Sequence, residues 1–378
     1  MYWFVFLLLL VFSIVEIKNK SISVIAFRFS YMLLTLMILL RKGQGTDYYN
    51  YRDIFNGIDI ITRNSILPLF LEKDFGYAFL NYIAIKCGIS YEFFIALCSL
   101  LVMLILYRFF DKICHRSVLV LYLFYATFFL IYPFNAIRQG LALAILLGYV
   151  YPFLCKGDYL KGFISIIVGS LFHQSFLICL LFLFVYKVRY STKCLLFIAL
   201  PFIFNLLLGI NVVQYIPIPF IIERIISYSE NEISSPFLSI IVRIIALIPI
   251  FLIPRDIYDK DDELRGVRNL MFCGFIVYSL FSFSDLVSSR LAAYFRVFEG
   301  LFLFRIIFYT KLKTINYQLA AYYITISAVL FTKDIAGFID QGSYVHCNVL
   351  TYPYLNIFDD DNTILYYRQN LGFSDRIE

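Results

Sequence analysis

Apolar runs long enough to cross a lipid bilayer recur along the whole chain, and they limit what it can fold into. Hydrophobic residues make up 61% of its 378 positions and charged residues only 15%, whereas about a quarter of the residues in soluble globular proteins are charged. A hydrocarbon layer roughly 30 Å thick offers no water to backbone N–H and C=O groups, so spanning segments fold as helices. The sequence therefore predicts an all-α, polytopic integral membrane helical bundle.

We expect about ten crossings and one re-entrant helical hairpin. No basic residue precedes the first apolar run and no small-x-small cleavage site follows it, so this run is interpreted as a retained helix rather than a signal peptide. The predicted crossings are Trp3–Val15, Ile22–Leu40, Tyr91–Phe110, Val118–Pro133, Ile137–Leu154, Cys194–Ile210, Phe237–Ile253, Val267–Asp285, Leu291–Tyr309 and Ile315–Phe331.

The apolar region Gly162–Tyr186 decides the topology, because counting it as a crossing reverses every later segment. Lys and Arg in short loops mark the cytoplasmic side of a membrane protein. The short basic loops all share one side only if this region enters the membrane and returns, with His173 near its turn. Non-helical backbone at such depth must be buried in protein or line a watery cavity, so the hairpin is a candidate functional element.

The resulting topology places both chain ends and the largest polar pieces on the outer face. These pieces are loops of about residues 41–90 and 211–236 and the tail 332–378, within a single polytopic membrane domain that covers 1–378. The cytoplasmic loops are short, and the acidic run Asp259–Glu263 in the longest of them is interpreted as a solvated face. We therefore expect the chemistry at the outer face.

Motifs for nucleotide and metal chemistry are missing from the sequence. It has no Walker sequence, no glycine-rich dinucleotide turn and no GxSxG or HExxH pattern. The eight cysteines lack metal-ligand spacing, and the basic residues form no stripe suited to nucleic acid. No cofactor, metal or nucleic acid is predicted, and a nucleotide-driven pump is disfavoured.

Arg138 is a permanent charge between two apolar crossings. It follows the helix break at Tyr132–Asn135 and lies in the first turn of the next predicted helix, where backbone N–H groups and the helix dipole attract anions. Gln139 adds a neutral donor and acceptor, and Gly140 permits close helix packing. One interpretation is a side chain that extends to the lipid headgroups. The other is a binding site for a diphosphate.

His173 and two carboxylates are the candidate catalytic groups. Imidazole can donate a hydrogen bond to a diphosphate or accept a hydroxyl proton, and the alternative is a buried histidine bonded to a carbonyl. Asp47, Asp74 and Arg52 lie among tyrosines in the first outer loop. Carboxylates can accept hydrogen bonds from sugar hydroxyls, whereas the tyrosines also suit an ordinary interfacial aromatic belt. The two aspartates are candidates for aligning an acceptor or for general-base work.

A second basic group opens the ninth crossing. Arg290, Tyr294 and Arg296 lie on overlapping faces at helical spacing. Glu299, one turn further along, is interpreted as the ion-pair partner of these arginines. We predict that Arg138 and Arg290 together bind the diphosphate, with Tyr294, Arg296 and Glu299 in support.

Five short segments in a fixed order carry a family resemblance. They are Gly45-Thr46-Asp47, Asp74-Phe75-Gly76-Tyr77, Ile137-Arg138-Gln139-Gly140-Leu141-Ala142, Leu171-Phe172-His173-Gln174-Ser175 and Ser289-Arg290-Leu291-Ala292-Ala293-Tyr294-Phe295. From about Thr46 to Phe295 the chain resembles the EpsG family of bacterial exopolysaccharide proteins, which are related to Wzy-type O-antigen and capsule polymerases. It departs from the family pattern at Asp74, where Glu is frequent, and at Gln174, where Pro is common.

The resemblance implies a GT-C-like glycosyltransferase at the outer face of the bacterial cytoplasmic membrane. Such an enzyme joins oligosaccharide repeat units carried on undecaprenyl diphosphate, without metal or nucleotide sugar. Its implied partners are the lipid-linked donor and acceptor, the bilayer and a regulator of chain length. Two alternatives are a glycan ligase of similar chemistry and a transporter or flippase of a lipid-linked sugar. Transporters often contain two related halves, and no internal repeat is found in this sequence.

Overall fold

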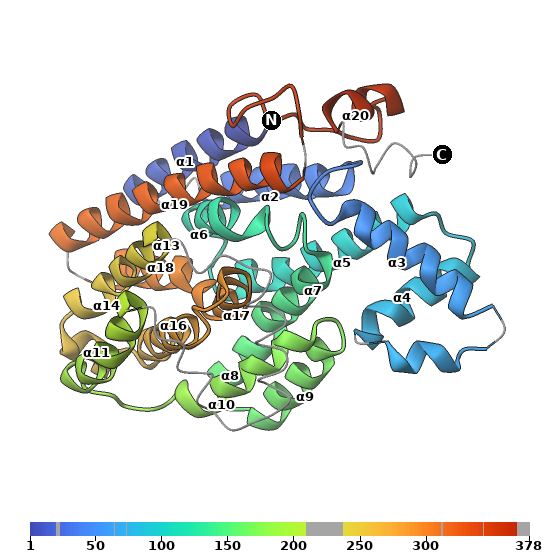
Figure 1. Ribbon diagram of the computed structural model, residues 1–378. Coiled ribbons are helices and arrows are strands. Elements are labelled where there is room, and N and C mark those ends of the chain that lie inside the picture. Colours follow the sequence, from blue (N-terminus) through green and yellow to red (C-terminus); the bar gives the residue numbers. More distant parts are fainter. Residues whose placement is uncertain are drawn as a thin grey trace. The chain divides into compact units, whose positions relative to one another are not determined.

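The computed structural model describes residues 1–378 except 20–22, 64, 73, 209–236, 311–312, 343 and 369–378. Its described part is helical, apart from loops and an isolated antiparallel bridge between Arg41 and Asn356 (Figure 1). The chain divides into two compact units, Met1–Gln174 with Thr314–Glu378 and Ser175–Lys313. The predicted outer loop of residues 211–236 lies outside the described residues.

Helices of the first unit follow the apolar runs of the sequence. Three segments, Tyr91–Lys112, Ile137–Lys156 and Asn316–Gln341, are long and apolar enough to cross a membrane. The elements are α1 (Tyr2–Lys18), α2 (Ser23–Leu39), α5 (Tyr91–Lys112), α6 (Val118–Phe124), the π-helical turn η3 (Tyr125–Phe129), α7 (Ile137–Ile145), the π-helical turn η4 (Leu146–Val150), α8 (Tyr151–Lys156), α9 (Tyr159–Ser170), α19 (Lys313–Gln341) and α20 (Asp361–Tyr367).

A buried carboxylate joins three of these helices. Glu16, near the end of α1, is only 2% exposed. It accepts hydrogen bonds from Leu119 N (2.8 Å) and Ser117 Oγ (3.1 Å) at the start of α6. A third bond comes from Ser23 Oγ (2.7 Å) at the start of α2. Because the first N–H groups of a helix lack partners within it, a carboxylate at this position satisfies them and complements the helix dipole.

The last helix of the first unit is longer than predicted. The predicted crossing ends at Phe331 because charged residues such as Lys333 interrupt the apolar run, yet α19 continues to Gln341. Exposed charged side chains do not break a helix, so α19 extends beyond the predicted crossing. The outer-face position of residues 332–378 stays a prediction. In Figure 1, α19 lies beside α1, where the rings of Phe331 and Phe6 stack at 4.6 Å between centroids.

The predicted outer loop 41–90 folds as a pair of helices. It contains α3 (Tyr48–Ile61), the 3-10 turn η2 (Leu67–Leu71) and α4 (Phe75–Lys86). Ile58, Leu69 and Ala78 are buried together and hold these elements to one another. This region is therefore a structured element that can fix the positions of polar side chains.

Two predicted crossings of the second unit are each divided into two helices. The run Phe237–Ile253 is broken before Pro249, which lies in the first turn of α14. The run Leu291–Tyr309 is broken at Val297–Phe298. The elements of this unit are η5 (Gln174–Leu180), α10 (Leu181–Val185), α11 (Thr192–Leu208), α13 (Phe237–Ile245), α14 (Ile248–Leu252), α15 (Arg255–Lys260), α16 (Asp262–Leu280), α17 (Asp285–Arg296) and α18 (Glu299–Tyr309).

Helices α16 and α17 pack closely because a glycine lies between them. A Cβ atom on Gly274 would lie only 2.5 Å from the Cβ of Phe295. Small residues at a helix–helix contact allow the backbones to approach. This contact fixes the helix that carries Arg290.

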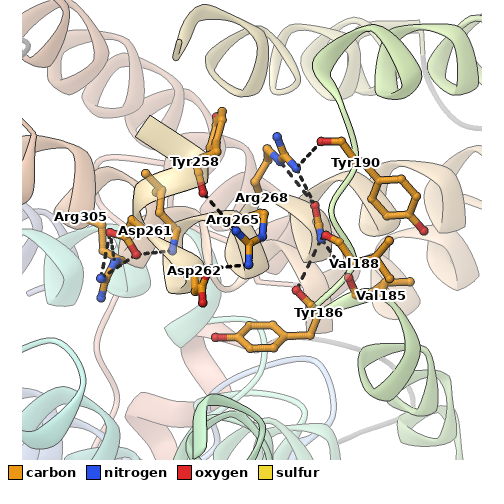
Figure 2. A network of polar contacts seen from close by, with 12 residues as sticks. Val185, Tyr186, Val188, Tyr190, Tyr258, Asp261, Asp262, Arg265, Arg268 and Arg305 are labelled. Atoms are coloured by element: carbon orange, nitrogen blue, oxygen red, sulfur yellow. Dashed lines mark hydrogen bonds and ion pairs between the residues drawn. The ribbon is translucent and has the colours of Figure 1, made fainter. Parts of the chain in front are cut away.

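The acidic run Asp259–Glu263 is not simply a solvated face (Figure 2). Asp261 accepts a hydrogen bond from Leu264 N (2.9 Å) and so caps α16. Arg305 of α18 binds the Asp261 carboxylate at 2.9 Å and also pairs with Glu263. Because both acidic side chains are partly buried in these pairs, they connect α16 to α18.

The same network holds the segment after α10 against α16 (Figure 2). Asn269 donates hydrogen bonds to Val185 O (2.9 Å) and Val188 O (2.8 Å). Arg268 donates to Tyr190 O (3.1 Å), and its guanidinium lies 4.4 Å from the ring centroid of Tyr258. These bonds satisfy backbone carbonyls where α10 ends.

Replacing Gly140 with Ala should destabilise the first unit. A Cβ at this position would lie 2.9 Å from Tyr132 O and 3.0 Å from Pro133 Cα, and backbone atoms cannot move aside easily. We expect a loss of about 1–3 kcal/mol in unfolding free energy, measured by thermal unfolding in detergent. Gly57→Ala is the matched control, because no described atom lies within 4 Å of its Cβ position in α3. That variant should gain roughly 0.5–1 kcal/mol, and equal stability of the two variants would contradict the packing argument.

Candidate active site

Arg138 forms an ion pair with Asp74 at the start of α7. The Nη1 atom of Arg138 lies 2.6 Å from Oδ2 of Asp74, and the Asp74 side chain is only 11% exposed. The guanidinium also faces the rings of Tyr51 and Tyr77, at 5.3 and 6.0 Å from their centroids. Arg138 is therefore held by a carboxylate and two aromatic rings, and it does not extend alone toward the headgroups.

His173 lies beside the same carboxylate. Its Nδ1 atom is 3.9 Å from Asp74 Oδ2. The backbone N–H of Gln174 donates to Asp74 Oδ1 (3.2 Å), and the N–H of Gly76 donates to Leu171 O (2.8 Å). The start of α4 is thus attached to the turn that follows α9, and Arg138 and His173 share Asp74 as neighbour.

The predicted helix break near His173 is present. Helix α9 ends at Ser170, and the next helical turn begins at Gln174. The 12 residues of α9 are about 18 Å long at 1.5 Å per residue, too short for a bilayer core of roughly 30 Å. Re-entry of the chain on the side it came from stays a prediction.

The Gly45-Thr46-Asp47 segment is fixed to the break that precedes Arg138. Asn135 Oδ1 accepts from Asp47 N (3.0 Å), and Asn135 Nδ2 donates to Thr46 Oγ1 (2.8 Å). Gly45 has a φ of +91°, and a Cβ there would lie 2.4 Å from Asn135 Oδ1, so a glycine is required. Among the described residues, no group donates a hydrogen bond to the Asp47 carboxylate, which acts electrostatically on Tyr51.

The charge state of Asp74 depends on its neighbours. Burial alone would raise the pKa of this carboxyl, but the adjacent His173 ring, the Arg138 guanidinium and the Gln174 N–H together lower it below its usual value. The carboxylate therefore remains ionised at neutral pH. It is also a weaker base than an isolated aspartate.

Two donor atoms of this cluster have no acceptor. Arg138 Nε and His173 Nδ1 are both buried and make no hydrogen bond with the described part of the chain. Buried polar atoms nearly always have a partner, so an exception requires an explanation. His173 Nδ1 has Asp74 as its neighbour at 3.9 Å, so Arg138 Nε is the nitrogen that an oxygen-rich ligand could satisfy.

Arg41 is a buried cation beside the break that precedes α7, and sequence reasoning missed it. It is 6% exposed, and its Nε and Nη1 atoms have no hydrogen-bond partner among the described residues. Its guanidinium lies 4.9 Å from the ring centroid of Phe134, in the break before α7. Burial lowers the pKa of Arg41, while nearby tyrosines such as Tyr91 and Tyr48 favour its charged form. An arginine just after an apolar run is the usual snorkelling pattern, so the sequence carried no signal of this burial.

The other predicted residues of the first unit lie on its helices. Gln139 is 2% exposed on α7, and Arg52 is half-buried on α3. These positions leave their proposed roles in binding as predictions.

The predicted residues of the second unit are gathered around α17. Tyr294 is fully buried, and its hydroxyl lies 3.2 Å from Ser175 Oγ. Arg296 and Glu299 form the expected ion pair, with 2.9 Å between Nε and Oε1. Arg290 is half-buried on the same helix, and its joint site with Arg138 stays a prediction. Within the described ranges, no group of three or more His, Cys, Asp or Glu residues is suited to a metal ion.

The fold and this cluster define a helical membrane protein with a charged site at the start of a long apolar helix. The chain belongs to the EpsG family, whose family model matches residues 24–356. This match confirms the resemblance carried by the five sequence segments. No curated protein and no solved structure matches the chain.

Substituting Asp74 with Asn should remove a pH-dependent contribution to stability. Because the folded-state pKa of Asp74 lies below the unfolded value of about 3.9, the carboxylate stabilises the fold above that pH. This contribution is lost as the pH falls through the folded-state pKa. In detergent, wild type should therefore melt at a higher temperature than Asp74→Asn at pH 7, and the difference should shrink below about pH 4.

Asp59→Asn provides the control for this experiment. Asp59 forms an exposed pair with Arg63 at 3.7 Å on α3, and such pairs contribute little. A Tm difference between wild type and Asp74→Asn that does not change with pH would show that the ion pair is not its source.

Proposed function

We propose that this protein is a polymerase of lipid-diphosphate-linked oligosaccharide repeat units, acting in exopolysaccharide, capsule or O-antigen biosynthesis. Membership of the EpsG family supports a role in polysaccharide synthesis. The observation that carries the proposal is the contact of Arg138, Asp74 and His173 at the start of α7. In this proposal the site lies at the outer face of the cytoplasmic membrane, and the short basic loops lie inside.

The reaction moves a growing glycan from its lipid diphosphate to a new acceptor. The bond between the anomeric carbon and the diphosphate oxygen breaks, and its electron pair stays on the diphosphate. The acceptor hydroxyl oxygen forms the new bond to that carbon and gives up its proton. Because negative charge grows on the leaving diphosphate, a rigidly held cation in a water-poor site stabilises the transition state. Arg138 supplies this cation, at the positive end of the α7 dipole.

His173 is the proposed acceptor of the hydroxyl proton. Asp74, behind the ring at 3.9 Å, would orient the imidazole and stabilise its protonated form. Catalytic hydrogen bonds are often long in an empty site and shorten when substrate binds. Asp74 itself is a poor base because of its lowered pKa. The Asp47 carboxylate is then the group that aligns the acceptor sugar.

The central experiment supplies purified protein in detergent with a fluorescent lipid-linked repeat unit. A ladder of longer oligosaccharides is the expected result. Transfer of a single unit to a different acceptor would instead identify a ligase. Movement of the lipid across vesicle membranes with no ladder would identify a transporter.

Removing the cation should stop polymer growth without unfolding the protein. We expect Arg138→Ala to slow ladder formation by about 10²–10³-fold, the cost of losing one group that stabilises transition-state charge. Arg63→Ala is the matched control, since the Arg63 side chain is 69% exposed and, among the described residues, its ion pair is with Asp59 on the surface. Wild-type chain length in Arg138→Ala, with normal membrane insertion, would remove Arg138 from the mechanism.

Arg41 should contribute to binding at the expense of stability. A buried cation without a partner destabilises a fold, so Arg41→Met should raise the unfolding free energy by about 1 kcal/mol or more. The same variant should raise the KM for the lipid-linked donor at least tenfold, because a cation near the diphosphate is lost. A lower Tm together with an unchanged KM would show that Arg41 is structural only.

A further inference from the structure

An apolar groove in the first unit runs between α5, α7 with η4, and α9. It encloses about 310 Å³, and Ser165 is the one residue of its lining without an apolar or aromatic side chain. Its walls include Leu101 and Ile105 of α5, Leu141 and Ile145 of α7, and Ile164 and Val168 of α9. No described side chain fills this space, so it can hold part of an apolar molecule.

One end of the groove lies next to the charged cluster. Leu141 follows Arg138 by three residues on α7, so the two side chains share a face one helical turn apart. Phe172, which also lines the groove, directly precedes His173. Two separate elements thus connect the apolar space to the two groups that lie beside Asp74.

An aromatic residue lines the groove further along the same helix, in η4. Tyr149 lines it there, and its hydroxyl accepts a hydrogen bond from Arg108 Nη1 at 2.9 Å. From Leu141 to Tyr149 the helix advances by about 12 Å. Gly148 holds η4 against α5, since a Cβ there would lie 2.6 Å from Ile105 Cγ2. The π-helical turn at η4 is of a kind often found at functional sites.

We propose that this groove binds the polyprenyl chain of the lipid-linked substrate, in the units nearest the diphosphate. The inference rests on the proposed function, because that function supplies an amphiphile with an anionic head and an apolar tail. Arg138 and His173, which both lie beside Asp74, are at the head end, and the apolar walls begin one turn away. Lipid tails are as apolar as the groove, so the groove acts by shape and position and gives little net hydrophobic affinity.

Photocrosslinking in lipid nanodiscs tests the proposal directly. The probe is undecaprenyl diphosphate with a diazirine in the prenyl unit next to the diphosphate. Label should concentrate on the groove residues of α5, α7 and α9, and unlabelled undecaprenyl diphosphate should compete for it. Equal labelling of the outward-facing Leu104 of α5, which is 60% exposed, would overturn the proposal. Equal competition by phosphatidylglycerol would overturn it as well, because the groove would then be a general lipid site.

A filled groove provides the matched test by mutation. Ser165→Trp places a large ring in the groove, and the Ser165 hydroxyl bonds only to Lys161 O within its own helix, so the fold loses little. This variant should reduce groove labelling at least tenfold and raise the KM for the donor. Ile167→Trp is the control, since Ile167 lies on the same helix, is 39% exposed and does not line the groove. Unchanged labelling in Ser165→Trp, with a Tm like that of the control, would refute the assignment.

The outcomes separate this inference from the proposed function. If the wild-type protein is labelled in the groove but forms no ladder, the result supports the binding site and contradicts the proposed polymerase function. If the protein forms a ladder but the label lies outside the groove, the result supports the polymerase function and contradicts the assignment of the groove as the binding site.

Discussion

A guanidinium in an apolar helical protein requires a counter-charge, and much of the first unit depends on how Arg138 obtains one. The Asp74 carboxylate that pairs with it also accepts the N–H of Gln174 and lies beside His173. One carboxylate therefore joins the starts of α4 and α7 to the turn after α9, three segments that are far apart in the sequence. Because an unpaired buried charge costs several kcal/mol, these segments are expected to assemble together.

The positions of the long apolar helices could be predicted, because the hydropathy of a segment depends on its own residues and not on how the segment packs. The run predicted as Tyr91–Phe110 is α5, Tyr91–Lys112, and the break before α7 was visible at Pro133. The division between α17 and α18 was not visible, since no Pro lies there and Gly300 follows only in the first turn of α18. The Arg296–Glu299 pair that spans this division was nevertheless predicted, because the two charges are three positions apart in the sequence. Helices α3 and α4 were missed for a related reason, because a search for apolar runs long enough to cross a bilayer ignores helices of 14 and 12 residues.

The candidate site was predictable in its members but not in its contacts. Arg138, Asp74 and His173 were each recognisable as polar groups in unusual surroundings, yet Arg138 and Asp74 are 64 positions apart. No helical or strand periodicity links such positions. Asn135 looked like part of a simple helix break, but both ends of its amide hold the Gly45-Thr46-Asp47 segment. Its role becomes apparent only when the partners are seen together.

Charge balance at the cluster explains why one arginine is insufficient for the proposed ligand. When the site is empty, Asp74 already neutralises Arg138, so a diphosphate that binds beside this pair adds at least two negative charges without a counter-ion. At a separation of about 4 Å in partly buried surroundings, each uncompensated like-charge contact costs about 4 kcal/mol. Arg41, whose buried Nε and Nη1 atoms have no acceptor in the described chain, can supply a second positive charge. A diphosphate is therefore a better explanation of this cluster than a neutral sugar alone, since hydroxyl groups would leave the charge of Arg41 uncompensated.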